Sequence, residues 1–142
     1  MIWRWMIWLV YVAVWTWALL VPNPDQWASA LILGNEPDSG AHDSVGQQIL
    51  SVLDSYLFSK ALHISAYAVL AVLSGWVGCG RIRWALLAFM SLHALGSEFL
   101  QSFEPSRHPS WDDVGFDHIG IGMGMVLSWK WWTRGFSQKP GQ

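Results

Sequence analysis

An almost uncharged run of apolar residues opens the chain and constrains its fold more than any other feature. The segment Ile2–Val21 reads IWRWMIWLVYVAVWTWALLV, in which Arg4 is the single charged residue. A helix that rises 1.5 Å per residue crosses a hydrocarbon layer of about 30 Å in roughly 20 residues. The end of the run, WALLVPNP, lacks the small-residue pattern of a signal-peptide cleavage site. We therefore expect a retained membrane span at about residues 2–21.

Three further apolar segments have the length of short membrane helices, and we expect spans at about 61–78, 84–101 and 116–132. The five residues from Cys79 to Arg83 leave room only for a tight turn between two of them. The chain is 53% hydrophobic and only 13% charged, against roughly 25% charged in soluble domains. We expect residues 1–142 to form a single all-α domain, a four-helix transmembrane bundle.

The segment between the first two spans, residues 22–59, combines helix breakers with one helical pattern. Several prolines interrupt its first half. From Asp43 or Ser44 to about Ser59, apolar residues recur at helical spacing with polar residues between them. This pattern predicts an extra amphipathic helix, which would lie either along the membrane surface or across the mouth of the bundle.

The basic residues predict the orientation of the spans. With both termini in the cytoplasm, six of the eight Lys and Arg residues fall inside, and only Lys60 and Arg107 fall outside. All ten acidic residues fall outside in the same arrangement. We therefore expect a multi-pass protein of the cytoplasmic membrane, with its N-terminus and C-terminus in the cytoplasm.

Each of the three later spans carries polar residues at its outer end. They lie at i, i+3 and i+7 on the second span, at i and i+3 on the third, and at i and i+4 on the fourth, so each set shares one helix face. The residues are Lys60, His63, Tyr67, Glu98, Gln101, Asp113 and Asp117. Because ionisable groups are costly at membrane depth and often mark function, we expect these side chains to converge.

Three more residues complete the picture of the outer ends. Gly120 and Gly124 continue the face of the fourth span and form a G-x-x-x-G pattern, which predicts close helix packing. Arg107 follows Pro105 in the loop between the third and fourth spans, where it could turn back towards a carboxylate or hold a phosphate. His93, within the third span, is expected to be buried and hydrogen-bonded.

In order and spacing, these residues resemble the VanZ-like family of integral membrane proteins. That family pattern has Lys-x-x-His-x-x-x-Tyr opening one span, Glu-x-x-Gln ending the next, an Arg several residues later, and Asp, Asn and two Gly in the last span. The chain matches it in KALHISAY and EFLQSFEPSRHPSWDDVGFDHIGIGMG, over about residues 56–130, with Asp117 where the family has Asn. The resemblance implies a bacterial cell-envelope protein, in a family named for low-level resistance to the glycopeptide teicoplanin.

The residues leave three classes of function open. The chain could bind or remodel an amphiphilic cell-envelope ligand at the outer leaflet, either a membrane lipid or a lipid-linked cell-wall precursor. It could instead be a membrane enzyme that acts on such a substrate by carboxylate and histidine acid–base chemistry. It could also be a structural membrane scaffold whose polar residues hold the helices together.

Other functions are less compatible with the sequence. The net charge of −2 and the lack of a basic patch argue against a nucleic-acid partner. One cysteine, Cys79, rules out an internal disulfide framework. We expect no cofactor and no metal, because no recognised metal motif is present. A scattered metal site would need His63, Glu98, Asp113, Asp117 and His118.

Overall fold

The computed structural model describes residues 2–20, 45–103 and 110–133, with residues 45–55 described as backbone. Within these ranges the chain is helical and contains no strand, which confirms the all-α class. The helices are α1 (Ile2–Leu20), α3 (Val45–Val77), α4 (Ile82–Gln101), α5 (Trp111–Leu127) and the short α6 (Trp129–Trp132).

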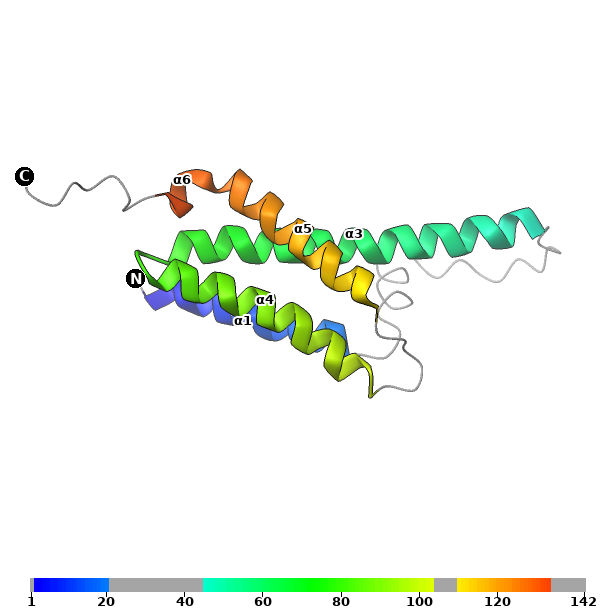
Figure 1. Cartoon of the computed structure of the whole chain (residues 1–142), viewed down its shortest axis with the longest axis horizontal. Helices are drawn as coiled ribbons and strands as arrows, with labels where there is room; N and C mark the ends of the chain where they lie inside the picture. The colour runs from blue at the N-terminus through cyan, green and yellow to red at the C-terminus, as the bar shows by residue number, and fades with distance from the viewer. Residues whose placement is uncertain (1, 21–44, 104–109, 134–142) are drawn as a thin grey trace, which may run out of the picture.

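Helix α3 differs from the expectation. The sequence predicted an amphipathic helix ending near Ser59 and a separate span at 61–78, but α3 continues without a break for 33 residues. Residues 47–74 contain neither proline nor glycine, so nothing in the local sequence ends the helix near Ser59. The separate helix was therefore wrong: residues 45–59 form the first part of α3, which is about 50 Å long and extends beyond the other helices (Figure 1).

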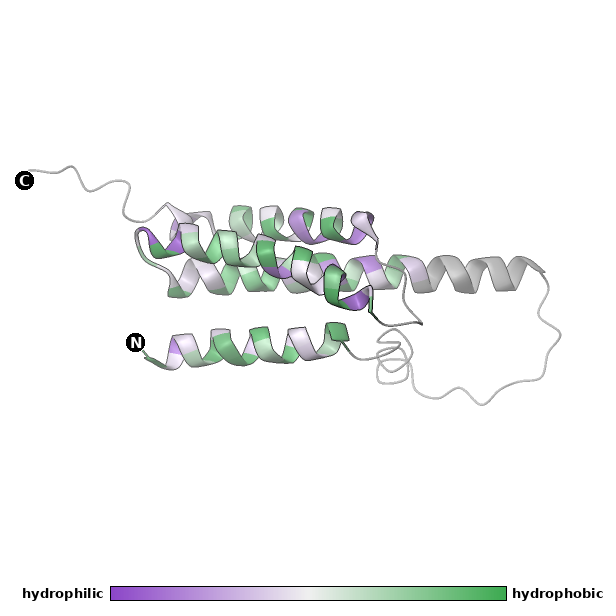
Figure 2. Ribbon diagram, turned by 60° about the horizontal axis from the view of Figure 1, so that its bottom comes forward, coloured by the Kyte–Doolittle hydropathy of each residue, from purple (hydrophilic) through white to green (hydrophobic). Residues whose placement is uncertain are grey.

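Two helical segments are long and apolar enough to cross a membrane, judged by length and composition: Ile2–Leu20 and Tyr56–Val77. Figure 2 shows α1 as hydrophobic along most of its length. The other two long helices match the length and composition of a membrane span less well. Helix α4 contains the charged residues Arg83 and Glu98, and α5 has only 17 residues.

Helix α3 is the centre of the packing, with α1, α4, α5 and α6 all in contact with it. Its most extensive contact is with α5, where Gly120 and Gly124 lie against the α3 backbone. A Cβ atom on Gly120 would overlap the carbonyl oxygen of Ile64, and one on Gly124 would overlap that of Ala68 and lie 2.7 Å from the Cβ of Ala71. The two glycines therefore allow the backbones to approach at the place where the G-x-x-x-G pattern predicted a helix contact.

The hydrophobic core between these helices is joined by a few polar contacts. Tyr67, Leu70 and Met90 are completely buried in it. The indole N–H of Trp8 donates to the Ser74 hydroxyl at 2.9 Å and so ties α1 to α3. Further core residues come from α3, α4, α5 and α6: Ala71, Val77, Leu86, Ala94, Ile121 and Trp132.

The helix ends fall into two groups (Figure 1). The start of α1, the turn between α3 and α4, and α6 lie at one end of the packed helices. The ends of α1 and α4 and the start of α5 lie at the other end. We call the second group the polar end, since it includes the last residues of α4, Glu98–Gln101, and the first residues of α5, Trp111–Asp113.

Candidate functional site

The outermost contact at the polar end is an ion pair between α3 and α5. The Lys60 ammonium group pairs with the Asp113 carboxylate, and both side chains are largely buried, at 11% and 15% exposed. The ammonium group also lies 4.8 Å from the centre of the Tyr56 ring and 5.7 Å from that of Phe116. These aromatic faces add a favourable cation–π interaction. The Lys60 ammonium group is therefore held by partners from the protein itself.

One helical turn deeper, a histidine and a carboxylate repeat the arrangement. The Nδ1 atom of His63 lies 2.8 Å from Oδ1 of Asp117, and Asp117 is completely buried. The Trp15 ring of α1 meets the His63 ring edge to face, with 6.3 Å between the ring centres. Oδ2, the second carboxylate oxygen of Asp117, has no hydrogen-bond partner among the described residues.

A third polar contact lies still deeper and joins three helices. The Tyr67 hydroxyl lies 2.8 Å from Nδ1 of His93, and Nε2 of His93 lies 2.8 Å from the Thr16 hydroxyl. Thr16 already donates its one hydroxyl proton to the Val12 carbonyl, so it must accept from Nε2–H. Nδ1 is then the acceptor for Tyr67 in a neutral ring. His93 is hydrogen-bonded as expected but only partly buried. The sequence did not predict the role of Thr16, because one small hydroxyl side chain in a largely apolar span was its only signal.

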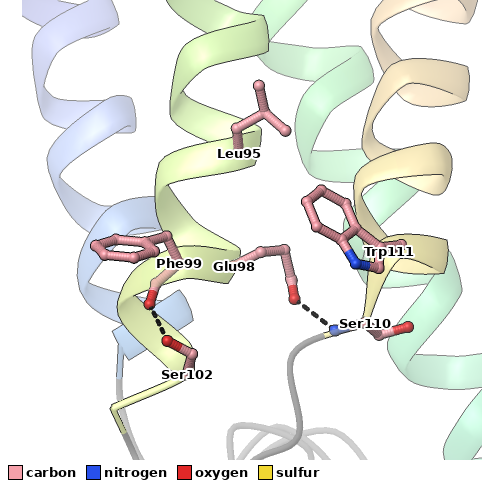
Figure 3. Close-up of a pocket in the computed structure, with 6 residues that line it drawn as sticks. All are labelled: Leu95, Glu98, Phe99, Ser102, Ser110 and Trp111. Carbon is pink, nitrogen blue, oxygen red and sulfur yellow. Dashed lines mark hydrogen bonds between the residues drawn. The ribbon is translucent and has the colours of Figure 1, made fainter.

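Glu98 connects the end of α4 to the start of α5. Its Oε2 atom accepts a hydrogen bond of 2.9 Å from the backbone N–H of Ser110, the residue before α5. Only 6% of Glu98 is exposed, and its Oε1 atom has no hydrogen-bond partner within the described part of the chain. Figure 3 shows the carboxylate between the two helices, beside the ring of Trp111.

The Glu98 side chain lies in a pocket of about 220 Å³. Apolar side chains make up most of the pocket wall, namely Leu95 and Phe99 of α4 and Trp111 of α5. Ser102, which follows α4, and Ser110, which precedes α5, complete the lining. Leu95, Phe99 and Trp111 are exposed large hydrophobic residues, and Trp111 is 82% exposed. This pocket therefore combines an apolar wall with one buried acidic group, as binding sites for small amphiphilic molecules commonly do.

Gln101 has a different partner from the other polar residues. Its side-chain Nε2–H donates to the Leu19 carbonyl in the last turn of α1, at 3.1 Å. Carbonyl groups in the last turn of a helix lack an intrahelical partner, so Gln101 satisfies one of them. It joins α1 to α4 rather than facing the other polar side chains.

Five residues at this end form what we call the polar cluster: Lys60, His63, Glu98, Asp113 and Asp117, all buried or largely buried. Arg107, a candidate from the sequence, lies outside the described residues. His118 is exposed, and its Nδ1 atom lies 2.7 Å from the Val114 carbonyl oxygen one turn earlier in α5. No group of three metal-binding side chains occurs in the described ranges, so the scattered metal site drawn from His63, Glu98, Asp113, Asp117 and His118 is not assembled there.

Within the polar cluster, each basic side chain is paired with a carboxylate, whereas some carboxylate oxygens have no hydrogen-bond donor among the described residues. Lys60 and His63 each face an aspartate, while Glu98 and Asp117 each keep a carboxylate oxygen without a described partner. Buried polar atoms are usually hydrogen-bonded, so an orphan acceptor is a point at which a donor can bind. A buried His beside an Asp can also act in proton transfer.

Comparison with known proteins places the chain in a family. A family model described as VanZ/LLP1 matches residues 8–133, most of the chain. Comparisons with curated proteins and with solved structures give no match. The match includes all of the polar cluster, the two packing glycines and the residues 56–130 on which the resemblance rested. The chain belongs to the VanZ/LLP1 family.

Proposed function

We propose that α1, α3, α4 and α5 form a four-helix transmembrane bundle in the bacterial cytoplasmic membrane, with both termini in the cytoplasm. The distribution of side chains supports this. Large hydrophobic residues are exposed along α1, α4 and α5, among them Val14, Leu92 and Val126. Polar residues such as Ser74, Ser97 and Asp117 are buried between the helices. Apolar side chains outside and polar ones inside suit a lipid environment.

The charges support the orientation. The turn Cys79–Arg81 and α6 lie at the end opposite the polar end (Figure 1), and that end carries Arg81, Arg83 and Lys130. Basic residues near span ends favour the cytoplasmic side. The polar end is then on the outer side, at the level of the outer leaflet.

We further propose that the protein binds or remodels an amphiphilic cell-envelope ligand at this outer leaflet. Membrane lipids and lipid-linked cell-wall precursors are the candidate partners, which fits a family named for glycopeptide resistance. The observation that carries the proposal concerns Glu98. Its buried carboxylate lines a largely apolar pocket, and one of its oxygens has no hydrogen-bond partner among the described residues. The exposed apolar side chains of Leu95, Phe99 and Trp111 favour a ligand with an apolar part over a fully polar one.

Lipid mass spectrometry of the purified protein tests this function. We expect wild-type protein to retain a specific lipid or precursor that Glu98→Ala loses. Asp112→Ala is the matched control, because Asp112 is an exposed carboxylate in the first turn of α5. Identical bound lipids in all three proteins would contradict the proposal.

A membrane enzyme is the second candidate, and the His63–Asp117 contact of 2.8 Å favours it. A carboxylate on Nδ1 orients the ring and stabilises its protonated form, which is how histidine bases are commonly held. His63→Gln would then abolish turnover of a lipid-linked substrate while leaving ligand binding in place. Loss of folded protein with the same substitution would instead favour the structural scaffold, the third function that the sequence leaves open.

A further inference from the structure

The pocket beside Glu98 has chemical features that restrict its ligand further than the proposed function does. Its walls come from the last two turns of α4 and the first residues of α5, and the apolar side chains Leu95, Phe99 and Trp111 form most of the surface. A volume of about 220 Å³ is enough for a small headgroup and the adjoining part of a chain. The pocket lies at the polar end, between the end of α4 and the start of α5.

Among the described residues, Glu98 is the only acidic residue that lines the pocket, and its side chain points between the two helices (Figure 3). Oε2 of Glu98 is engaged by the Ser110 N–H, whereas Oε1 is buried and has no partner among the described residues. A buried carboxylate oxygen that loses water without gaining a hydrogen bond is strongly destabilising. The site therefore favours an occupant that donates a hydrogen bond.

The charge balance favours a cation over a neutral donor. Glu98, Asp113 and Asp117 supply three carboxylates to the polar cluster, and its described cations are Lys60 and His63. Both are committed to the aspartates, Lys60 to Asp113 and His63 to Asp117. With the three carboxylates ionised and His63 protonated, three negative and two positive charges leave the described residues of the cluster with a net negative charge. Glu98 is thus the carboxylate for which the described residues supply no cation.

We propose that this pocket binds the primary ammonium headgroup of an amphiphile, with an N–H of the ammonium group donating to Oε1 of Glu98. The adjoining chain lies against Leu95, Phe99 and Trp111. This inference rests on the proposed ligand-binding function and specifies its ligand class.

Three phospholipids with identical acyl chains separate the features that the pocket requires. Phosphatidylethanolamine carries an ammonium group with N–H donors, phosphatidylcholine has the same charges without a donor, and phosphatidylglycerol has hydroxyl donors without a cation. Native mass spectrometry of the full chain in detergent, with the lipids in equimolar competition, measures their relative binding. We expect phosphatidylethanolamine to bind at least about tenfold more tightly than either competitor, as a charge-assisted hydrogen bond provides.

Two substitutions connect this preference to the pocket. Glu98→Gln keeps an acceptor for the Ser110 N–H but removes the charge, so the preference should disappear while the protein stays folded. Asp112→Asn removes one charge at the same end from an exposed side chain outside the pocket, so the preference should remain. Equal binding of all three lipids by the wild-type protein would overturn the inference, as would an unchanged preference in Glu98→Gln.

Leu95→Trp distinguishes failure of this inference from failure of the proposed function, because it reduces the pocket volume and leaves the charge of Glu98 unchanged. If Leu95→Trp abolishes lipid binding but the wild type does not discriminate among headgroups, the pocket binds an amphiphile and only the ammonium assignment is wrong. If Leu95→Trp and Glu98→Gln both bind every lipid as the wild type does, the site and the inference fail together. Ammonium selectivity that appears only after Arg107→Gln would show that Arg107 is the natural cation at Glu98.

Discussion

At the scale of single residues, the polar end is organised by which atoms already have partners. Asp113 and Asp117 lie one helical turn apart on α5, and each meets a basic side chain from α3. Pairs of this kind stabilise little by themselves, but breaking one leaves a buried charge or donor unsatisfied. Stability and binding can therefore be separated by choosing substitutions that keep or remove the acceptor.

Asp117 tests this directly, since the VanZ-like pattern has Asn at its position. Asp117→Asn keeps an oxygen that can accept from the Nδ1–H of His63, so we expect little change in the thermal unfolding of the purified protein. Asp117→Ala removes the acceptor and should lower the free energy of unfolding by about 1–3 kcal/mol. Equal stability of the two variants would show that His63 does not depend on this hydrogen bond.

The ion pair of Lys60 and Asp113 calls for a double-mutant cycle. Lys60→Met and Asp113→Leu should each be destabilising, because each leaves the partner charge without its counter-ion in a largely buried place. The double variant should be less destabilised than the sum of the two, with a coupling energy of about 0.5–3 kcal/mol. Additive effects, measured by chemical unfolding in detergent, would mean that the pair contributes nothing to stability.

At the scale of elements, the contact between α3 and α5 sets the positions of the polar residues. Gly120 and Gly124 bring α5 against the backbone of α3, and Asp113 and Asp117 precede them on the same helix. The close approach is what places the two aspartates beside Lys60 and His63. The packing glycines and the polar cluster are therefore parts of one arrangement.

Alanine substitutions on α5 should separate its packed face from its exposed face. Gly124→Ala places a Cβ against the Ala68 carbonyl, which belongs to a helix backbone and cannot move aside, so we expect a loss of about 1–3 kcal/mol. Gly122→Ala is the matched control, because nothing lies within 4 Å of its Cβ position. It should be neutral or stabilising, since alanine favours helix. Equal melting temperatures of the two variants would contradict this packing.

At the scale of the whole molecule, the two ends of the helices differ in charge and chemistry. One end carries the buried polar cluster, and the other carries aromatic side chains together with basic residues. There the Arg4 guanidinium group lies 4.5 Å from the centre of the Trp76 ring, and the Trp3 and Trp76 ring centres are 5.1 Å apart. Tryptophan and arginine together are typical of a membrane interface.

Cys79 reports which end faces the cytoplasm. It is exposed in the turn between α3 and α4 and is the only cysteine of the chain. In intact cells we expect no reaction with a membrane-impermeant maleimide, and labelling only after permeabilisation. Ser106→Cys in a Cys79→Ser background should give the opposite result. Labelling of Cys79 in intact cells would reverse the proposed orientation.

Local sequence determined which faces of the helices are polar. The i, i+3 and i, i+4 spacings placed Lys60 with His63, Glu98 with Gln101, and Asp113 with Asp117, because the helical period depends on each helix alone. The same local information wrongly predicted that a helix ends near Ser59. The segment has no helix-breaking residue there, and α3 continues through it.

Which of these residues meet was decided only by the tertiary structure. The rotation and axial position of one helix against another depend on packing between segments that are distant in the sequence. At Gly120 and Gly124, which have no side chain, the backbone of α5 packs directly against the backbone of α3. This brings Lys60 to Asp113 and His63 to Asp117. It also directs Gln101 to α1 rather than to the polar side chains. Glu98 is left beside an apolar pocket with one unpartnered oxygen among the described residues, because no helical period specifies the distance between two different helices.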